Sequence, residues 1–458
     1  MNQNYDLGCD PVGRLLLRLS VPAIAAQVVN MLYNIVDRIY IARIPEVGSL
    51  ALTGIGVTTP IVVLVTAFTS LIGIGGSART SIAMGEGDGE RAERVLGNCF
   101  SAILCIGVLL TAAILAGKGP LLTLLGASEA TFGYADDYLT IYIAGTLCVM
   151  LTVGLNSFIT CQGMSMTAML TVLIGAVLNI VLDPIFIFVF GMGVQGAALA
   201  TVLSQGVAAV WVLAFFFGKK TRLRIRRRNL RFSREVILPV LALGASPFVM
   251  QSTESLLSIT YNVSLAKYGG DLAVGAMAVL VSLRQVMQLP LTGLTQGAQP
   301  ILGYNFGARN PARMRQTVRY TVCAALVYVL LFWAAALFAP ELLAGVFTPD
   351  RDLIAFTAWA IRIYFAVAVC SCFQHCYQQC FLALDEAKIS LLLALLRKIV
   401  LLIPLILILP HFFENKLFAV FLSEPVADAI AAAVTTLAFQ LRFRTILRGI
   451  ETPDAQNG

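Results

Sequence analysis

The sequence predicts an all-α polytopic membrane protein whose twelve transmembrane helices form two six-helix bundles related by a pseudo-two-fold axis. Of the 458 residues, 58% are hydrophobic and only 12% are charged, whereas soluble domains carry about 25% charged residues. Apolar stretches of about 20 residues, the length that crosses a bilayer, recur along the whole chain. The two halves of the chain also carry the same landmarks at matching places.

Twelve apolar stretches are long enough to be transmembrane helices. The first, seventh and eighth are among those that exceed 25 residues, and we expect these three to tilt, kink or protrude from the membrane. The predicted helices cover residues 15–41, 53–78, 95–116, 138–160, 168–190, 196–217, 236–266, 274–301, 318–338, 356–382, 389–409 and 417–441.

Basic residues are concentrated in the loops on one side of the predicted membrane. The segment 218–234 holds nine of them, whereas loops on the other side hold isolated ones such as Lys118 and Lys416. Cytoplasmic loops are enriched in Lys and Arg, so both termini are expected in the cytoplasm. This topology accounts for the net charge of +7 without a nucleic-acid partner, and it places the basic segment near anionic membrane lipids.

An internal repeat divides the chain into two similar halves. Pro22 in the first helix matches Pro247 in the seventh, and Gly85 after the second helix matches Gly307 after the eighth. Each half has an even number of helices, so both enter the membrane in the same direction and their axis lies along the membrane normal. Such paired bundles are typical of transporters that work by alternating access. The predicted division is an N-terminal bundle (1–217), a basic cytoplasmic linker (218–234) and a C-terminal bundle (235–458).

A carboxylate lies inside the apolar fifth helix. Asn179 and Asp183 are four residues apart and therefore share one helical face. An ionised Asp near the bilayer centre costs at least ~2.5–3.5 kcal/mol, so this residue is expected to face a protein-lined or watery cavity and to be functional. Pro184 directly follows and should bend the helix, because proline removes a backbone hydrogen bond.

A second carboxylate, Asp37, lies nearer the outer end of the first helix. One interpretation is an interfacial residue paired with Arg38 or Arg43. The other is a functional site, because the first and fifth helices belong to one bundle and would bring Asp37 close to Asp183. Two neighbouring carboxylates repel each other, so one should accept a proton near neutral pH. Polar residues on neighbouring faces of this bundle are Asn30, Tyr33, Asn34, Thr201 and Gln205.

The second half carries an acid and several bases in its apolar helices. Glu254 lies in the seventh helix, Arg284 in the eighth, and Arg397 and Lys398 in the eleventh. A buried lone charge is costlier than a buried pair. We therefore favour an internal ion pair of Glu254 with Arg284 or Arg397 over a second ion site.

Other chemistries find little support in the sequence. No GxxxxGK[ST] motif is present, and the two histidines lack a constellation for hydrolysis, so an enzyme is not expected. Cys372, Cys376 and Cys380 share a helical face near His375 and allow a soft-metal site geometrically. The spacing is not that of zinc sites, and we predict no metal.

These motifs together resemble the multidrug and toxic compound extrusion (MATE) family, and within it the MepA-like branch. The likeness rests on Asn34-Ile35-Val36-Asp37, on Gly85-Glu86-Gly87-Asp88, on Asn179 to Pro184, and on Thr201. The resemblance implies two six-helix bundles that export bulky, often cationic drugs in exchange for H+ or Na+. It also implies a cation-coupling site at Asp37, Asn179, Asp183 and Thr201.

One departure from the family concerns the second bundle. Some members have a cation site there, with one acid in the seventh helix and another in the tenth. Glu254 matches the first acid, but the tenth predicted helix, 356–382, contains no carboxylate. A second-bundle Na+ site is therefore not predicted.

We expect a secondary antiporter of the plasma membrane that works as a monomer, with H+ or Na+ as coupling ion and no other cofactor. Its partners would be small amphipathic cations and membrane lipids. The alternative is a flippase for a lipid-linked precursor, with Arg284, Arg397 and Lys398 available for a pyrophosphate. Substrate-cavity candidates are Asn30, Tyr33, Asn34, Gln205, Gln251, Glu254 and Gln288.

Overall fold

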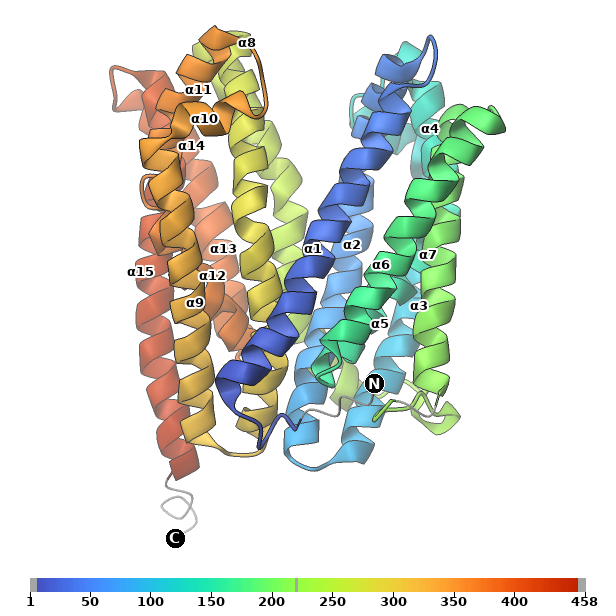
Figure 1. Cartoon of the computed structure of the whole chain (residues 1–458), viewed down its shortest axis with the longest axis vertical. Coiled ribbons are helices and arrows are strands. Elements are labelled where there is room, and N and C mark those ends of the chain that lie inside the picture. Colours follow the sequence, from blue (N-terminus) through green and yellow to red (C-terminus); the bar gives the residue numbers. More distant parts are fainter. Residues whose placement is uncertain (1–5, 219–220, 452–458) are drawn as a thin grey trace.

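The computed structural model describes residues 6–218 and 221–451, and the regular structure in this part of the chain is helical (Figure 1). The helices form an N-terminal lobe, α1–α7, and a C-terminal lobe, α8–α15. The N-terminal lobe contains α1 (Val12–Ala42), α2 (Gly48–Gly85), α3 (Gly89–Leu124), α4 (Glu129–Ala144), α5 (Thr146–Cys161), α6 (Ser165–Pro184) and α7 (Gly193–Phe217). The C-terminal lobe contains α8 (Arg234–Gly307), α9 (Pro311–Phe338), α10 (Pro340–Gly345), α11 (Arg351–Tyr364), α12 (Ala368–Ala383), α13 (Ala387–Leu395), α14 (Ile403–Ile408) and α15 (Lys416–Glu451).

The predicted number of membrane spans is confirmed within the described residues. Nine segments are each long and apolar enough to cross a membrane, and α4–α5 and α11–α12 are two further spans, each bent by 55°. One of the nine, α8, contains two spans, because the backbone turns at Gly270 with a φ of 62° that glycine adopts readily. Counted in this way, the described chain has twelve spans.

Several predicted helices are less regular than their sequences suggested. The fourth breaks at Gly145, where an added Cβ would lie 2.4 Å from a methyl carbon of Val202. The missing side chain therefore lets α7 approach the bend. Two π-helical segments, Ile185–Val189 and Leu396–Leu402, lie beside the prolines of the fifth and eleventh helices, and such segments are frequent at functional sites.

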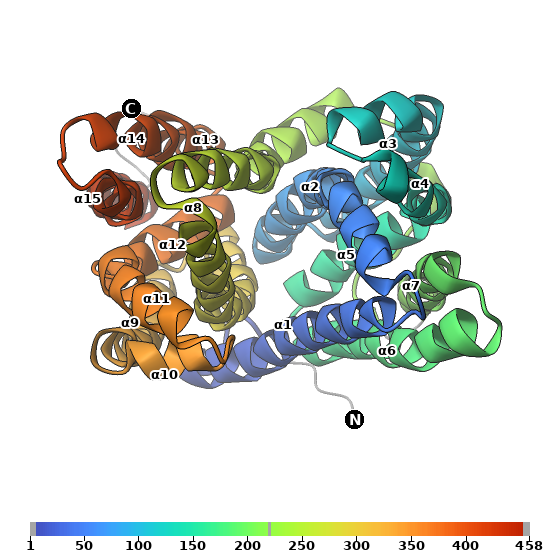
Figure 2. The same ribbon diagram turned by 90° about the horizontal axis from the view of Figure 1, so that it is seen from above.

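The first helix of each half begins in the other lobe. Leu15 and Leu19 of α1 are buried in the apolar core of the C-terminal lobe, whereas Ile41 at its far end is buried in the N-terminal core. Val240, near the start of α8, is buried in the N-terminal core. Figures 1 and 2 show α1 crossing from beside α9 to beside α6. Both crossing helices thus connect the lobes.

The two lobes touch closely at the side where the described chain begins and ends. Gly85 of α2 and Gly307 of α8, the pair matched in the repeat, lie at this contact. An added Cβ on Gly85 would lie 1.9 Å from the Tyr304 carbonyl oxygen, and one on Gly307 would lie 2.1 Å from that of Ile82. Arg79 also forms an ion pair across the lobes with Asp385. We call this the closed side.

Away from the closed side the lobes separate. Polar contacts still join them at Gln251 to Ser70, at 2.7 Å, and at Gln27 to Gln296, at 3.1 Å. Beyond these contacts the helices of the two lobes diverge toward the Ala42 end of α1 and the Gly270 turn of α8 (Figure 1). The lobes therefore form a V that opens away from the described chain ends.

The basic linker folds against α3 at the closed side. Arg226 pairs with Glu93 and Arg228 with Glu90, both at 2.7 Å. Asn98 of α3 donates to the Asn229 carbonyl at 3.2 Å. Part of the linker charge is therefore neutralised within the protein, and the predicted contact of the linker with lipid stays a prediction. Lys219 and Lys220 lie outside the described residues.

Candidate cation site

Asp183 is the buried centre of a polar cluster in the N-terminal lobe. It lies at the end of α6 and has 0% exposure. The Asn179 amide nitrogen donates to Asp183 Oδ1 at 3.1 Å and approaches the Thr201 hydroxyl of α7 at 3.3 Å. The spacing of four residues on α6 thus places amide and carboxyl side by side, with the adjacent helix supplying the hydroxyl.

Asp37 completes this cluster from α1. Its carboxyl group interacts directly with that of Asp183, and it forms no ion pair with Arg38 or Arg43 within the described part of the chain. The structure thus places Asp37 beside Asp183 rather than in an ion pair with either arginine, and its role as a functional residue stays a prediction. Residues 37, 179, 183 and 201, predicted from three separate helices, lie together in the structure.

Several oxygens of the cluster lack a hydrogen-bond donor. Asp37 Oδ1, Asn179 Oδ1 and Asp183 Oδ2 are buried, and none has a hydrogen-bond partner among the described residues. Buried polar atoms are almost always paired, and ionised carboxylates can only accept. An arrangement of this kind can hold a positive species between the oxygens, either a proton or a cation with a preference for oxygen ligands.

Aromatic residues surround the carboxyl pair. Tyr33 of α1 and Tyr138 of α4 both interact electrostatically with Asp37 and Asp183, and Tyr138 stacks on Tyr142 at 5.9 Å. Tyr33 was predicted near the site, whereas Tyr138 was missed. Its position one residue after Asp136-Asp137 in an apolar segment gives no signal that it lies near Asp37 and Asp183.

The other substrate-cavity candidates are spread over both lobes. Asn30 and Asn34 are exposed on the face of α1 near Asp37, and Gln205 Oε1 is buried in the N-terminal lobe without a partner in the described chain. Gln251 contacts the opposite lobe and Gln288 is half-buried. Their role in lining a substrate cavity stays a prediction.

The predicted ion pair of Glu254 with Arg284 or Arg397 is wrong, because Glu254 pairs with Lys398. Arg284 instead pairs with Glu424, and Arg397 contacts Asp428 at 2.6 Å. The physical reason is that α15 supplies two buried acids that match the two arginines.

Glu424 and Asp428 were missed by the sequence reasoning although a signal for them exists. They are four residues apart in an apolar helix, the same pattern that identified Asn179 and Asp183. Both side chains are buried, and the Tyr261 hydroxyl also donates to Glu424 at 2.8 Å. The two acids and two arginines form an internally neutral network, which we call the α15 network.

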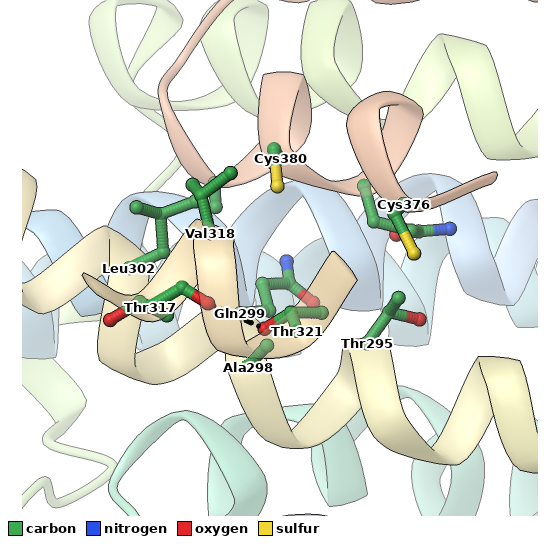
Figure 3. A pocket seen from close by; sticks show the side chains of 11 residues that line it. Thr295, Ala298, Gln299, Leu302, Thr317, Val318, Thr321, Cys376 and Cys380 are labelled. Carbon is green, nitrogen blue, oxygen red and sulfur yellow. Dashed lines mark hydrogen bonds between the residues drawn. The ribbon is translucent and has the colours of Figure 1, made fainter. Parts of the chain in front are cut away.

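A small pocket lies deeper in the C-terminal lobe, between α8, α9 and α12 (Figure 3). Its volume is about 10 Å³, and its lining includes the uncharged polar residues Gln299, Thr317 and Thr321. Cys376 and Cys380, considered above as metal ligands, also face it. Within residues 6–218 and 221–451, no group of three or more His, Cys, Asp or Glu side chains is arranged to hold a metal ion.

Two lobes of six spans each, with a polar cluster buried inside one lobe, define a polytopic membrane protein of the transporter class. The MatE family model matches residues 22–185 and 247–408. The chain belongs to this family, whose members are multidrug and toxic compound extrusion transporters.

Curated relatives and solved structures agree with this assignment. The chain is 25% identical over 350 residues to the multidrug export protein MepA of Staphylococcus haemolyticus (strain JCSC1435), covering 76% of each chain. It is 23% identical to MepA of Staphylococcus aureus (strain NCTC 8325 / PS 47), covering 96% of this chain and 97% of that one.

Among solved structures, a MATE transporter in the straight conformation superposes with a TM-score of 0.89 at 26% identity, covering 97% and 99% of the two chains. A multidrug resistance MATE transporter in an outward-facing conformation has a TM-score of 0.89 at 25% identity, covering 95% and 97%.

Proposed function

We propose that the protein is a secondary antiporter of the plasma membrane that exports bulky amphipathic, often cationic compounds in exchange for H+ or Na+. The observation that carries the proposal is the contact between the Asp37 and Asp183 carboxyls, which have unpartnered buried oxygens. Membership of a multidrug exporter family supports the transport of small molecules, and the buried pair supplies a place for the coupling ion.

The carboxyl pair offers a mechanism for coupling. When a proton or Na+ occupies it, Asp37 and Asp183 attract the same positive species and α1 is held against α6. When the pair is empty, the two negative charges repel in a region of low dielectric constant, and α1 is released. Pro22 lies inside α1 and gives the helix a point at which to bend.

This movement would affect both lobes, because α1 begins in the C-terminal core and ends in the N-terminal core. Antiport requires that the ion and the substrate favour different arrangements of the lobes. In our mechanism, ion loading favours substrate release on the open side of the V. Because the basic loops lie on the closed side, we expect this side and both termini to face the cytoplasm.

The flippase alternative has weaker support. It needs basic side chains free to bind a pyrophosphate. Arg284, Arg397 and Lys398 each have an acidic partner, so a pyrophosphate would have to displace an internal carboxylate. Export of cationic compounds makes no such demand.

The test is dye efflux from proteoliposomes with proton and sodium gradients imposed separately. We expect Asp37→Asn and Asp183→Asn each to lower gradient-driven efflux at least about tenfold, since one proton or cation ligand is lost. Asp136→Asn is the matched control, because Asp136 lies in the same lobe and pairs with Lys118 instead. Undiminished efflux by both site variants would reject the proposal.

A further inference from the structure

Glu254 is an acidic side chain turned toward the space between the lobes. It lies one turn after Gln251, which contacts Ser70 of the opposite lobe, and Phe248, one turn before Gln251, packs on Phe68 at 4.9 Å. Glu254 thus follows the last of these contacts along α8, and 64% of its side chain is exposed. A carboxylate exposed to lipid would be costly, so this one faces water between the lobes.

Lys398 holds this carboxylate from inside the C-terminal lobe. Its side chain is only 3% exposed, and its ammonium donates to Glu254 Oε1 and to the Met250 carbonyl oxygen. The neighbouring arginines do not compete for Glu254, because the α15 network neutralises them. Glu254 and Lys398 therefore form a separate neutral pair, with the acid accessible and the base buried.

Other intramembrane acids are less suited to meet a substrate. Asp183, Glu424 and Asp428 are buried, and Asp37 is engaged with Asp183. A cation that approaches between the lobes thus meets the Glu254 carboxylate, which already binds the Lys398 ammonium group. The two positive groups must compete for one carboxylate.

We propose that Lys398 is a tethered competitor, which a positively charged group of the substrate must displace from Glu254. This inference rests on the proposed export of cationic compounds and names the residue that limits their affinity. The competition weakens binding in the open arrangement, where an exporter must release its cargo. The displaced ammonium keeps the Met250 carbonyl as a partner, which limits the cost of leaving a buried charge unpaired.

The experiment compares two dyes that share a ring system, cationic rhodamine 6G and zwitterionic rhodamine B, by fluorescence polarisation on the purified full chain. Lys398→Met frees Glu254 and is expected to tighten rhodamine 6G binding about tenfold, a change of about 1.4 kcal/mol, with little effect on rhodamine B. The double variant Glu254→Gln/Lys398→Met removes both charges and should bind rhodamine 6G more weakly than the wild type does.

The double variant also controls for folding, because it leaves no unpaired charge, and thermal unfolding of each protein is measured alongside. Unchanged rhodamine 6G affinity in Lys398→Met, or equal affinity in the two variants, would overturn the role of Lys398 while leaving the proposed antiport intact. A wild-type protein that binds neither dye would overturn both proposals.

Discussion

Replacing Gly85 by alanine should force the lobes apart at the closed side. A Cβ at this position would lie 1.9 Å from the Tyr304 carbonyl oxygen, where non-bonded contacts require at least about 3 Å. The lobes must therefore move by about 1 Å, and Arg79–Asp385, which crosses the same contact, would be strained. Overpacking of this kind costs roughly 1–3 kcal/mol.

That cost shifts the equilibrium away from the closed-side contact by about 5- to 150-fold, since about 1.4 kcal/mol corresponds to a factor of ten. In a hydrogen–deuterium exchange experiment, this shift should appear as faster exchange of the backbone amides of residues 304–308. Gly89→Ala is the control, because an added Cβ there meets nothing within 4 Å. Wild-type exchange rates in Gly85→Ala, or an equal increase in Gly89→Ala, would refute the reasoning.

Two further predictions concern stability and the linker. Glu424→Gln leaves Arg284 and Arg397 short of a buried counter-charge. In a thermal unfolding assay it should lower the free energy of unfolding by about 3–5 kcal/mol. The control Glu451→Gln removes the exposed pair with Arg315 and should lower the free energy of unfolding by less than about 1 kcal/mol. Gln162→Ala removes the acceptor that binds Thr221 and the backbone of residues 222 and 223. Trypsin should then cleave the linker faster than in Gln316→Ala, an exposed control, and equal cleavage rates would contradict this role of Gln162.

The span pattern was predictable from sequence because bilayer thickness sets helix length. The breaks within spans were not. The helix bends at Gly145, where Val202 of α7 packs closely, and that contact depends on how α7 is rotated. The crossing of α1 between the lobes is also a tertiary property, since Leu15 and Ile41 look equally apolar in the sequence.

The carboxyl cluster could be predicted because its members carry local signals. Asp183 stands out in an apolar helix, and Asp37 belongs to the same six-helix bundle. The partner of Glu254 could not be predicted, because adjacent residues Arg397 and Lys398 point to different neighbours. The pairing of each base with an acid depends on how the helices are rotated, and the periodicity of the sequence does not specify that rotation.

The most direct test of the central claim measures the ion that the carboxyl pair binds. A cationic substrate is added to purified protein in weakly buffered solution, and released protons and bound ²²Na+ are followed together. We predict that the wild-type protein releases one of these ions, and that Asp37→Asn and Asp183→Asn, although folded and able to bind the dye, release neither. Equal ion release by the wild type and both variants would contradict the account.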